Sequence, residues 1–117
     1  MPKLTPQKIQ LLFYRNTNGV EPVREWLKDL EQLDRNIAGL DLMRVQWRWP
    51  VGMPLCRPLD RGLWEVRTTL SGRRIARMIF CIHDRTLVVL HAFIKKTQKT
   101  PDAELALARK RQKELEK

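Results

Sequence analysis

The sequence predicts a small α+β domain, in which an antiparallel-rich sheet carries an αα-hairpin on one face and a basic surface on the other. Residues 63–100 contain three consecutive runs with the alternation or apolarity of β-strands. Residues 22–49 contain two apolar stripes with helical spacing, and residues 100–115 begin with a helix-start signal. With a first strand at residues 9–15, the expected order is β-α-α-β-β-β-α. Because the chain has 117 residues, of which 43% are hydrophobic, we expect one domain spanning residues 1–117.

The first two predicted elements are a strand and a helix. The run IQLLFYR at residues 9–15 is β-prone, and Asn18-Gly19 after it is a strong breaker. Pro22 suits the first turn of a helix, where its missing N–H leaves no hydrogen bond unmade. The apolar residues that follow fall at i, i+3, i+4 and i+7, which predicts one buried stripe: Val23, Trp26, Leu27 and Leu30.

A second helix is predicted from Asp34, a good N-cap residue, to the residues before Pro50. Its apolar residues are separated by four, three, three and four positions: Leu33, Ile37, Leu40, Met43 and Trp47. We expect this stripe, Trp47 included, to pack on the apolar face of the sheet. Trp49 lies outside the stripe and is the candidate for stacking on a nucleic-acid base.

Residues 51–62 are rich in glycine and proline and predict a loop that leads into the sheet. Residues 64–69 and 75–82 alternate in side-chain character, which is typical of strands with one buried face. Residues 87–94 are almost wholly apolar, as in a central strand that is covered on both faces.

The last predicted element is a helix that begins at Thr100, with Thr100 as the N-cap and Pro101 in the first turn. Its apolar residues form only a thin seam: Leu105, Ala108 and Leu115. Because basic residues crowd the rest of its surface, we expect this helix to be largely solvated.

The charge balance indicates a polyanionic partner. Twenty-three Lys and Arg against thirteen Asp and Glu give a formal charge of +10, which favours nucleic acid or an acidic protein. The sequence shows no leader and no long apolar span, so the expected location is cytoplasmic. Cys56 and Cys81 lack metal-ligand spacing, and Cys81 is expected to act as a small hydrophobic residue.

Classical catalytic constellations are missing from the sequence. His83 and His91 are the only histidines, and Ser71 is the only serine. Neither a metal site nor a Ser-His-Asp arrangement can be built from them, and no glycine-rich phosphate loop is present. We therefore expect no metal and no cofactor.

The strongest functional signal is a cluster of arginines. Residues 44–77 hold eight of them against only Asp60 and Glu65. The planar guanidinium group donates two parallel hydrogen bonds and therefore suits phosphate. If Arg67, Arg77 and Lys95 reach one surface of the sheet, they could clamp a phosphodiester. In RNA the substrate's own 2′-OH can then be the nucleophile, with the protein supplying alignment and charge neutralisation.

Two residues are candidates for proton transfer, and each has a competing structural role. Glu65 is a possible general base, or the cross-strand partner of an arginine. His91 lies in an apolar run and is a possible catalyst, or a core residue. Further cations are candidates for nucleic-acid binding or for plain solvated surface: Arg73, Arg74, Arg109 and Lys110.

Several stretches resemble the RelE/ParE toxin superfamily, specifically its phage-derived HigB-like branch. They are PVREWLKDL, LWEVR, ARMIFCIHD and LHAFIKKTQKTPDAELALARKR, and the resemblance covers roughly residues 9–113. It implies the RelE-like order β-α-α-β-β-β-α and a toxin of a type II toxin-antitoxin system. Such a toxin is a metal-independent mRNA interferase, an endoribonuclease that cleaves translated mRNA on the ribosome and arrests growth. The implied partner is a helix-turn-helix antitoxin that forms a hetero-oligomer with the toxin.

The resemblance also implies catalytic positions. The basic positions of the family fall on five residues: Arg67, Arg77, Lys95, Lys96 and Lys99. The sequence departs from better-known RelE members, because no tyrosine follows Lys99 and Glu65 stands where a lysine is sometimes found. Glu65 and His91 remain the candidates for acid–base roles.

Two other functions stay open at the level of sequence. One is a ParE-like protein that poisons a topoisomerase by binding, without cutting RNA. The other is a non-catalytic relative that binds only an antitoxin or nucleic acid. Strand-end arginines and the Lys95-Lys96 pair favour the nuclease, because a poison needs no aligned phosphate clamp.

Overall fold

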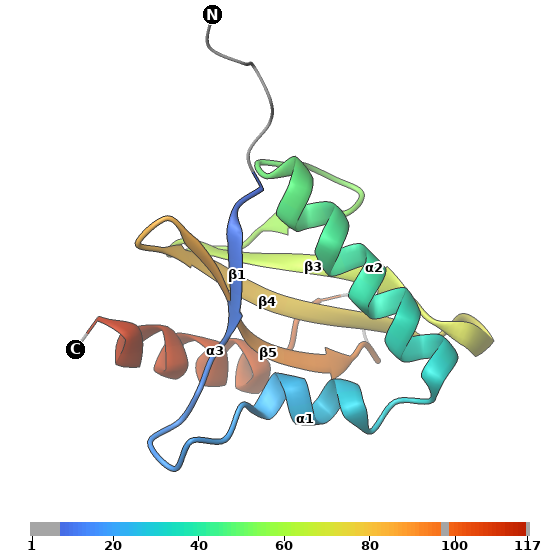
Figure 1. Ribbon diagram of the computed structural model, residues 1–117, viewed down its shortest axis with the longest axis horizontal. Coiled ribbons are helices and arrows are strands. Elements are labelled where there is room, and N and C mark those ends of the chain that lie inside the picture. Colours follow the sequence, from blue (N-terminus) through green and yellow to red (C-terminus); the bar gives the residue numbers. More distant parts are fainter. Residues whose placement is uncertain (1–7, 97–98, 117) are drawn as a thin grey trace, which may run out of the picture.

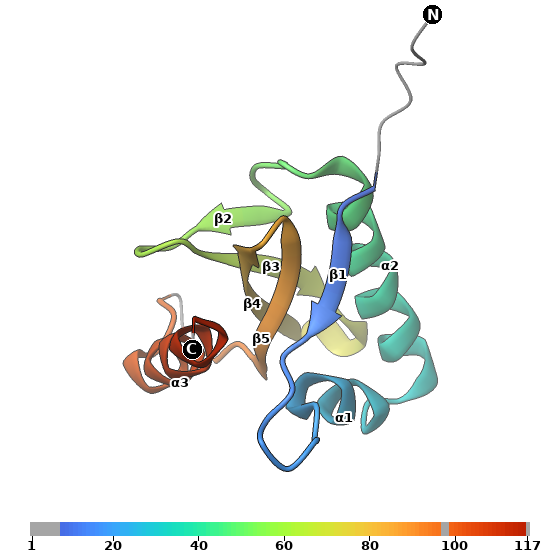
Figure 2. The ribbon, with the colours of Figure 1, turned by 60° about the vertical axis from the view of Figure 1, so that its left-hand side comes forward.

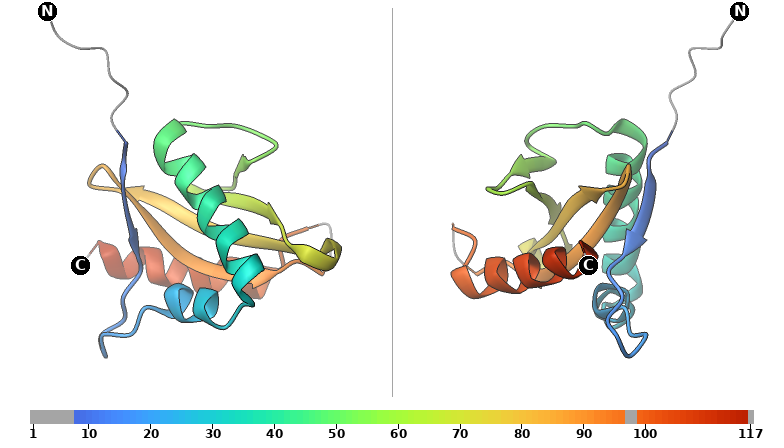
Figure 3. Two further views of the ribbon diagram at one scale, coloured as in Figure 1. Left: turned by 45° about the vertical axis from the view of Figure 1, so that its right-hand side comes forward. Right: turned by 90° about the vertical axis from the view of Figure 1, so that its left-hand side faces the viewer.

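A computed structural model describes residues 8–96 and 99–116, and this part of the chain forms a mixed α+β fold with helices on both faces of one sheet (Figures 1 and 2). The strands are β1 (Gln10–Phe13), β2 (Cys56–Pro58), β3 (Leu63–Thr69), β4 (Ile75–His83) and β5 (Thr86–Ile94). The helices are α1 (Pro22–Lys28), α2 (Gln32–Arg48) and α3 (Asp102–Leu115). In the sheet the strand order is β1-β5-β4-β3-β2, with β1 parallel to β5 and the other neighbours antiparallel. Helices α1 and α2 cover one face, and α3 lies against the other (Figures 2 and 3).

The three consecutive strands predicted from residues 63–100 are confirmed, and tight turns join them. Between β4 and β5, Asp84 and Arg85 both have positive φ, 49° and 61°. This left-handed pair matches the right-handed twist of the flanking strands and fixes their register. Between β3 and β4, a short 3₁₀ turn contains Gly72, whose φ of 67° is one that glycine adopts without steric cost.

The core lies on both faces of β4 and β5. On the face covered by α1 and α2, Phe80 and Val89 are fully buried, and on the face covered by α3, Ile79 and Leu90 are fully buried. All four residues of the run Leu87 to Leu90 are buried, which confirms β5 as a central strand covered on both sides.

Helix α2 presents the opposite face to the one predicted. Four residues of its predicted stripe are about half exposed or more: Leu33 (62%), Leu40 (47%), Met43 (52%) and Trp47 (51%). The buried residues are instead Asp34, Ala38, Asp41, Leu42 and Val45. Ala38 and Val45 are fully buried because their small side chains let the helix backbone approach the sheet.

Trp49, not Trp47, enters the core from the end of α2. Its ring packs edge-on against Trp64 at 4.9 Å and against Phe80 at 5.3 Å between ring centroids. Such edge-to-face contacts add to the burial of the rings. The prediction that Trp49 stacks on a nucleic-acid base is therefore wrong.

The N-cap prediction for Asp34 is also wrong, for a reason of tertiary structure. The helix begins at Gln32, and Asp34 is buried in its first turn. Its Oδ1 accepts a hydrogen bond of 2.9 Å from the backbone N–H of Ser71, and its Oδ2 pairs with Arg74. The carboxylate thus ties α2 to the turn between β3 and β4.

Two further predictions near the sheet edges need correction. Residues 56–58 form the edge strand β2 rather than a loop, with Cys56 opposite Val66. An edge strand tolerates proline, because the backbone N–H groups on its outer side have no neighbouring strand to bond. The prolines around residues 56–58 therefore led to the prediction of a loop. Helix α3 is not simply solvated, because Ala108 is buried and Arg111 donates a 2.7 Å hydrogen bond to the carbonyl of Leu90.

Cys56 and Cys81 are buried and unpaired, and burial raises the pKa of each thiol to about 11. They therefore remain protonated at neutral pH and act as small hydrophobic residues, as predicted for Cys81. Among residues 8–96 and 99–116, no helix is long and apolar enough to cross a membrane.

The substitution Asp34→Asn is expected to destabilise the fold at neutral pH but not in acid. The hydrogen bond from the Ser71 N–H holds the pKa of Asp34 below its usual 3.8, with smaller contributions from the Ser71 and Arg74 side chains, and these outweigh the opposing effect of burial. Because the folded-state pKa is the lower one, this stabilisation is present above the unfolded-state pKa and is lost as the pH falls through the folded-state value.

Thermal unfolding followed by circular dichroism between neutral pH and about pH 3 measures this effect. The wild type and Asp34→Asn should differ most at neutral pH and converge in acid. Asp29→Asn, at an exposed carboxylate at the end of α1, removes the same charge and should follow the wild type. A constant gap between wild type and Asp34→Asn across this range would contradict the role of the ionised carboxylate.

Candidate nucleic-acid interface

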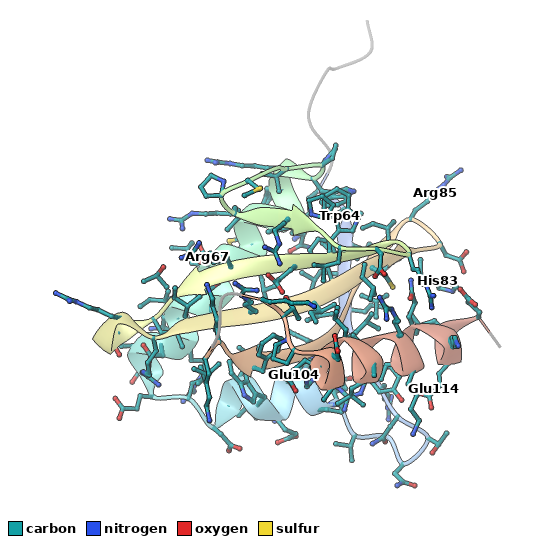
Figure 4. The ribbon with its side chains drawn as sticks, turned by 180° about the vertical axis from the view of Figure 1, so that it is seen from behind. Trp64, Arg67, His83, Arg85, Glu104 and Glu114 are labelled. Atoms are coloured by element: carbon teal, nitrogen blue, oxygen red, sulfur yellow. The ribbon has the colours of Figure 1, made fainter. Side chains whose placement is uncertain are left out.

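Strands β3, β4 and β5 bring cations to the face of the sheet that α3 partly covers. Arg67 lies directly opposite Arg77 in the register, Arg77 lies opposite Phe93, and the Lys95 N–H bonds the Ile75 carbonyl. Because side chains two apart on a strand share a face, Glu65, Arg67, Arg77 and Lys95 lie on one face. Figure 4 looks onto this face, with Arg67 at one end of it and His83 and Arg85 at the other.

A buried ion pair lies at the centre of these cations. Arg77 Nη1 is 3.0 Å from Glu65 Oε1, and their side chains are only 4% and 3% exposed. The hydroxyl of Thr100 joins the two: it accepts a 3.0 Å hydrogen bond from Arg77 and donates a 2.7 Å hydrogen bond to Glu65 Oε2. Thr100 therefore does not cap α3 as predicted, because its hydroxyl holds the start of that helix against β3 and β4.

The remaining cations surround this pair at the surface. Arg57 of β2 lies 3.9 Å from the same Glu65 oxygen, and Arg67 is exposed. The pKa of Lys95 is lowered, first by loss of solvent around its ammonium group and then by repulsion from Arg77, Arg67 and Arg57, while Glu65 opposes the shift. The described charges that act on Lys95 are thus three arginines and one carboxylate, so these groups and Lys95 together carry a surplus of three positive charges.

His91 is not brought to this cluster. In the sheet, His91 lies opposite Ile79, whereas Phe93 lies opposite Arg77. His91 is therefore one strand repeat, about 7 Å, away from Phe93 along β5. Its Nε2 is 3.2 Å from Glu104 of α3, and its ring stacks on Phe93 at 5.7 Å. Burial lowers its pKa, with Glu104 opposing and Arg111 adding to the shift, which favours a neutral imidazole at pH 7.

A hollow of about 600 Å³ opens beside His91, at the stretch of β5 that β1 does not cover. Trp26 of α1 and Phe93 supply aromatic walls, and Glu104 and Lys96 supply charge. Sequence reasoning assigned Trp26 to the core and missed this hollow. Lys99 is exposed, and Thr97 and Gln98 of the FIKKTQKTP motif lie outside the described residues.

A comparison with known families identifies the chain. The family model described as "Phage derived protein Gp49-like (DUF891)" matches residues 25–113, from α1 to α3. The chain belongs to the Gp49-like family. This is a toxin-like family of phage-derived proteins that is related to the RelE/HigB-type toxins. No curated protein matches the chain.

Other cations of this Gp49-like protein that the sequence marked for nucleic-acid binding lie elsewhere. Arg74 is held by Asp34 at the turn between β3 and β4, where the exposed Arg73 also lies. Arg109 of α3 is paired with Asp60, which precedes β3, whereas Arg67 lies near the end of that strand. Lys110 follows on α3 and lines a separate small hollow near Tyr14.

The structure also adds a residue that the sequence reasoning missed. Arg57 reaches Glu65 from β2, where Arg57 and Glu65 are directly opposite. Only a prediction of strand β2 would have placed Arg57 beside Glu65, and the prolines near Arg57 argued against a strand there. Among residues 8–96 and 99–116, no three His, Cys, Asp or Glu side chains gather as metal ligands.

Removal of Arg77 and removal of Arg67 should have different effects on stability. Arg77→Ala leaves the Glu65 carboxylate buried without its closest cation, which typically costs about 3–5 kcal/mol of unfolding free energy. Arg67→Ala acts at an exposed position and should stay within about 0.5 kcal/mol of the wild type. Urea unfolding followed by tryptophan fluorescence measures both.

The double variant Arg77→Met/Glu65→Leu is the matched control for the buried pair. It removes both charges together and should recover most of the stability that Arg77→Ala loses, because no lone buried charge remains. Equal losses for Arg67→Ala and Arg77→Ala would contradict the distinction between a buried structural arginine and an exposed one.

Proposed function

We propose that this Gp49-like protein is the toxin of a type II toxin-antitoxin system and acts as a metal-independent endoribonuclease on translated mRNA. The surplus of cations around Glu65 is the observation that carries the proposal. It offers a phosphate clamp on rigid strands, which hold side chains more precisely than loops do. Kinship with RelE/HigB-type toxins supports the ribosome as the place of cleavage and a helix-turn-helix antitoxin as the partner.

Arg67 and Lys95 are the proposed contacts to the scissile phosphate, with Lys96 and Lys99 contacting the flanking backbone. Arg67 donates two parallel hydrogen bonds from its guanidinium group to the phosphate oxygens. The buried Arg77 adds positive charge from beneath this surface. This arrangement stabilises the extra negative charge of the pentacovalent transition state. Removal of one such donor typically costs on the order of 10²–10³ in rate.

In the proposed reaction the 2′ oxygen attacks phosphorus while the bond from phosphorus to the 5′ oxygen breaks. The 2′ hydroxyl proton leaves to water, and the products are a 2′,3′-cyclic phosphate and a free 5′ hydroxyl. Lys95 is the proposed donor of the proton that the 5′ oxygen takes up, since a lowered pKa makes its ammonium a stronger acid. No cofactor enters this reaction.

Glu65 is assigned a positioning role in this scheme, and His91 is assigned no role in the cleavage. Both oxygens of Glu65 are engaged, by Arg77 and by Thr100, so its carboxylate orients the clamp. His91 lies beside the hollow with Glu104 and away from the phosphate site. Antitoxin binding would then need to neutralise the surface that Arg57, Arg67 and Lys95 share.

Unopposed expression of the protein should arrest growth, and Arg67→Ala should abolish the arrest. The variant should keep its fold but lack the guanidinium group that contacts the scissile phosphate, so it should no longer cleave RNA. Mapping of RNA 5′ ends should show cuts inside coding regions with the wild type and a loss of about 10²–10³ in cutting with Arg67→Ala.

Lys28→Ala is the matched control, because it removes one exposed positive charge at the end of α1, away from the clamp. It should cut and arrest growth as the wild type does. Arrest with intact mRNA and a DNA-damage response would contradict the proposal in favour of a topoisomerase poison, and cuts that persist in Arg67→Ala would contradict the assigned clamp.

As the pH rises, the affinity for single-stranded RNA should begin to fall at a lower pH than it would with a lysine of ordinary pKa. Because the pKa of Lys95 lies below its usual 10.5, its ammonium group loses its charge at a lower pH. Lys95→Arg keeps the charge, so its affinity should hold to higher pH than that of the wild type. Fluorescence anisotropy with a 2′-O-methyl oligonucleotide, which cannot be cleaved, measures this difference. Identical pH profiles would contradict contact between Lys95 and the phosphate.

A further inference from the structure

The hollow beside His91 contains aromatic and polar groups that the proposed cleavage does not use. Its volume of about 600 Å³ lies within the range of about 300–1,000 Å³ that is typical of small-molecule sites. Trp26 of α1 and Phe93 of β5 form two of its walls, and the His91 ring stacks on Phe93. Aromatic walls of this kind suit a flat, conjugated ligand, because stacked rings attract one another beyond the burial of their surface.

His91 supplies a hydrogen-bond donor to this hollow. Its Nδ1 lies 3.5 Å from Nη1 of Arg111, and a guanidinium group only donates, so Nδ1 is the acceptor nitrogen. Burial lowers the pKa of His91, so at pH 7 the ring is neutral and carries its one proton on Nε2. Nε2 is buried, and no described residue bonds it, although a Glu104 oxygen lies 3.2 Å away. A buried donor of this kind is a contact that a ligand can satisfy.

Glu104 places acceptor oxygens next to this donor. It lines the hollow from the first turn of α3, and its side chain is 27% exposed, so a ligand can reach it. A glutamate carboxylate accepts hydrogen bonds through two oxygens and donates none. One wall of the hollow therefore offers a donor on His91 beside two acceptors on Glu104.

This arrangement complements the Watson–Crick edge of guanine. That edge carries one acceptor, O6, followed by two donors, the N1–H and the N2 amino group. Adenine and cytosine each have a ring-nitrogen acceptor beside their amino donor, and uracil has one donor between two acceptors. Each of these three bases would therefore bring an acceptor against the carboxylate. Unpaired RNA bases are recognised in this manner, by stacking on aromatic side chains and by hydrogen bonds at their Watson–Crick edges.

The hollow lies close to the proposed phosphate clamp. Phe93 is opposite Arg77 in the sheet, one strand spacing of about 4.8 Å away. Lys96, which also lines the hollow, directly follows Lys95 of the clamp in the sequence. A nucleotide next to the scissile phosphate can therefore insert its base between the aromatic walls while the clamp holds the backbone.

We propose that the hollow is a guanine subsite, which receives the base of a nucleotide next to the scissile phosphate. Glu104 accepts hydrogen bonds from the N1–H and the amino group, His91 donates one to O6, and the ring stacks against Trp26 or Phe93. Figure 4 shows Glu104 on the same side of the molecule as Arg67 of the clamp. The inference rests on the proposed function, since it takes RNA as the ligand, and it adds a base preference to that function.

Fluorescence anisotropy with uncleavable 2′-O-methyl oligonucleotides tests the subsite. One probe is a short oligouridine with a single central guanosine, and three others carry inosine, adenosine or uridine at that position. The guanosine probe should bind about tenfold more tightly than the adenosine and uridine probes, as a good base-edge contact gives. Inosine lacks only the amino group, so it should bind with an affinity between these values.

Glu104→Gln is the variant that tests the hydrogen bonds to the base. It keeps the shape of the side chain but replaces one acceptor oxygen with a donor, so the preference for guanosine over inosine and adenosine should disappear. Asp102→Asn is the matched control, because it removes the same charge at an exposed position in the same first turn of α3. It should keep the preference for guanosine. Circular dichroism checks that both variants are folded.

Equal affinity of the wild type for the guanosine and inosine probes, a preference that survives in Glu104→Gln, or no binding of any probe would overturn the subsite. Arg67→Ala distinguishes this failure from failure of the clamp. It should weaken all four probes by a similar factor and keep the preference, because a phosphate contact carries no base information. Uniform weakening without any preference would refute the subsite alone, and a preference with no effect of Arg67→Ala would refute the clamp alone.

Discussion

The ion pair between Arg77 and Glu65 determines how the functional face of this protein is built. It joins neighbouring strands β3 and β4, and through the Thr100 hydroxyl it fixes the point where α3 starts. A charge buried without a partner is strongly destabilising, so neither residue can be lost alone. Around the pair lie Arg57, Arg67 and Lys95, and Glu65 is the one carboxylate among the described groups that shift the pKa of Lys95; this excess of positive charge is what the proposed phosphate clamp depends on.

The two faces of the sheet have different roles in this account. The α3 face is cationic, whereas the outer surface of α2 on the other side exposes apolar side chains. Asp34 connects the two sides, because it holds the turn between β3 and β4 from the first turn of α2. Each face therefore depends on a buried carboxylate that pairs with an arginine from another segment of the chain.

The sequence predicted the part of the site that local periodicity controls. Alternation along β3 and β4 indicated the face on which Arg67 and Arg77 lie, because a strand has a strict period of two, and Lys95 was expected to reach the same surface from the end of the apolar run of β5. It did not predict the orientation of α2, since Ala38, Leu42 and Val45 form a second apolar face. Asp34 on that face was predicted to be an N-cap, and only its tertiary partners, Ser71 and Arg74, explain its burial. Arg57 was missed because flanking prolines disguised a strand.

The central claim is that Arg67 contacts the RNA while Arg77 maintains the fold. Nuclear magnetic resonance of the arginine Nε–Hε groups, during titration with an uncleavable 2′-O-methyl RNA, separates the two roles most directly. We expect a large shift at Arg67 and a nearly unchanged signal at Arg77, which stays bonded to Glu65. Shifts confined to Arg73, Arg74 or Arg109, with Arg67 silent, would contradict the account.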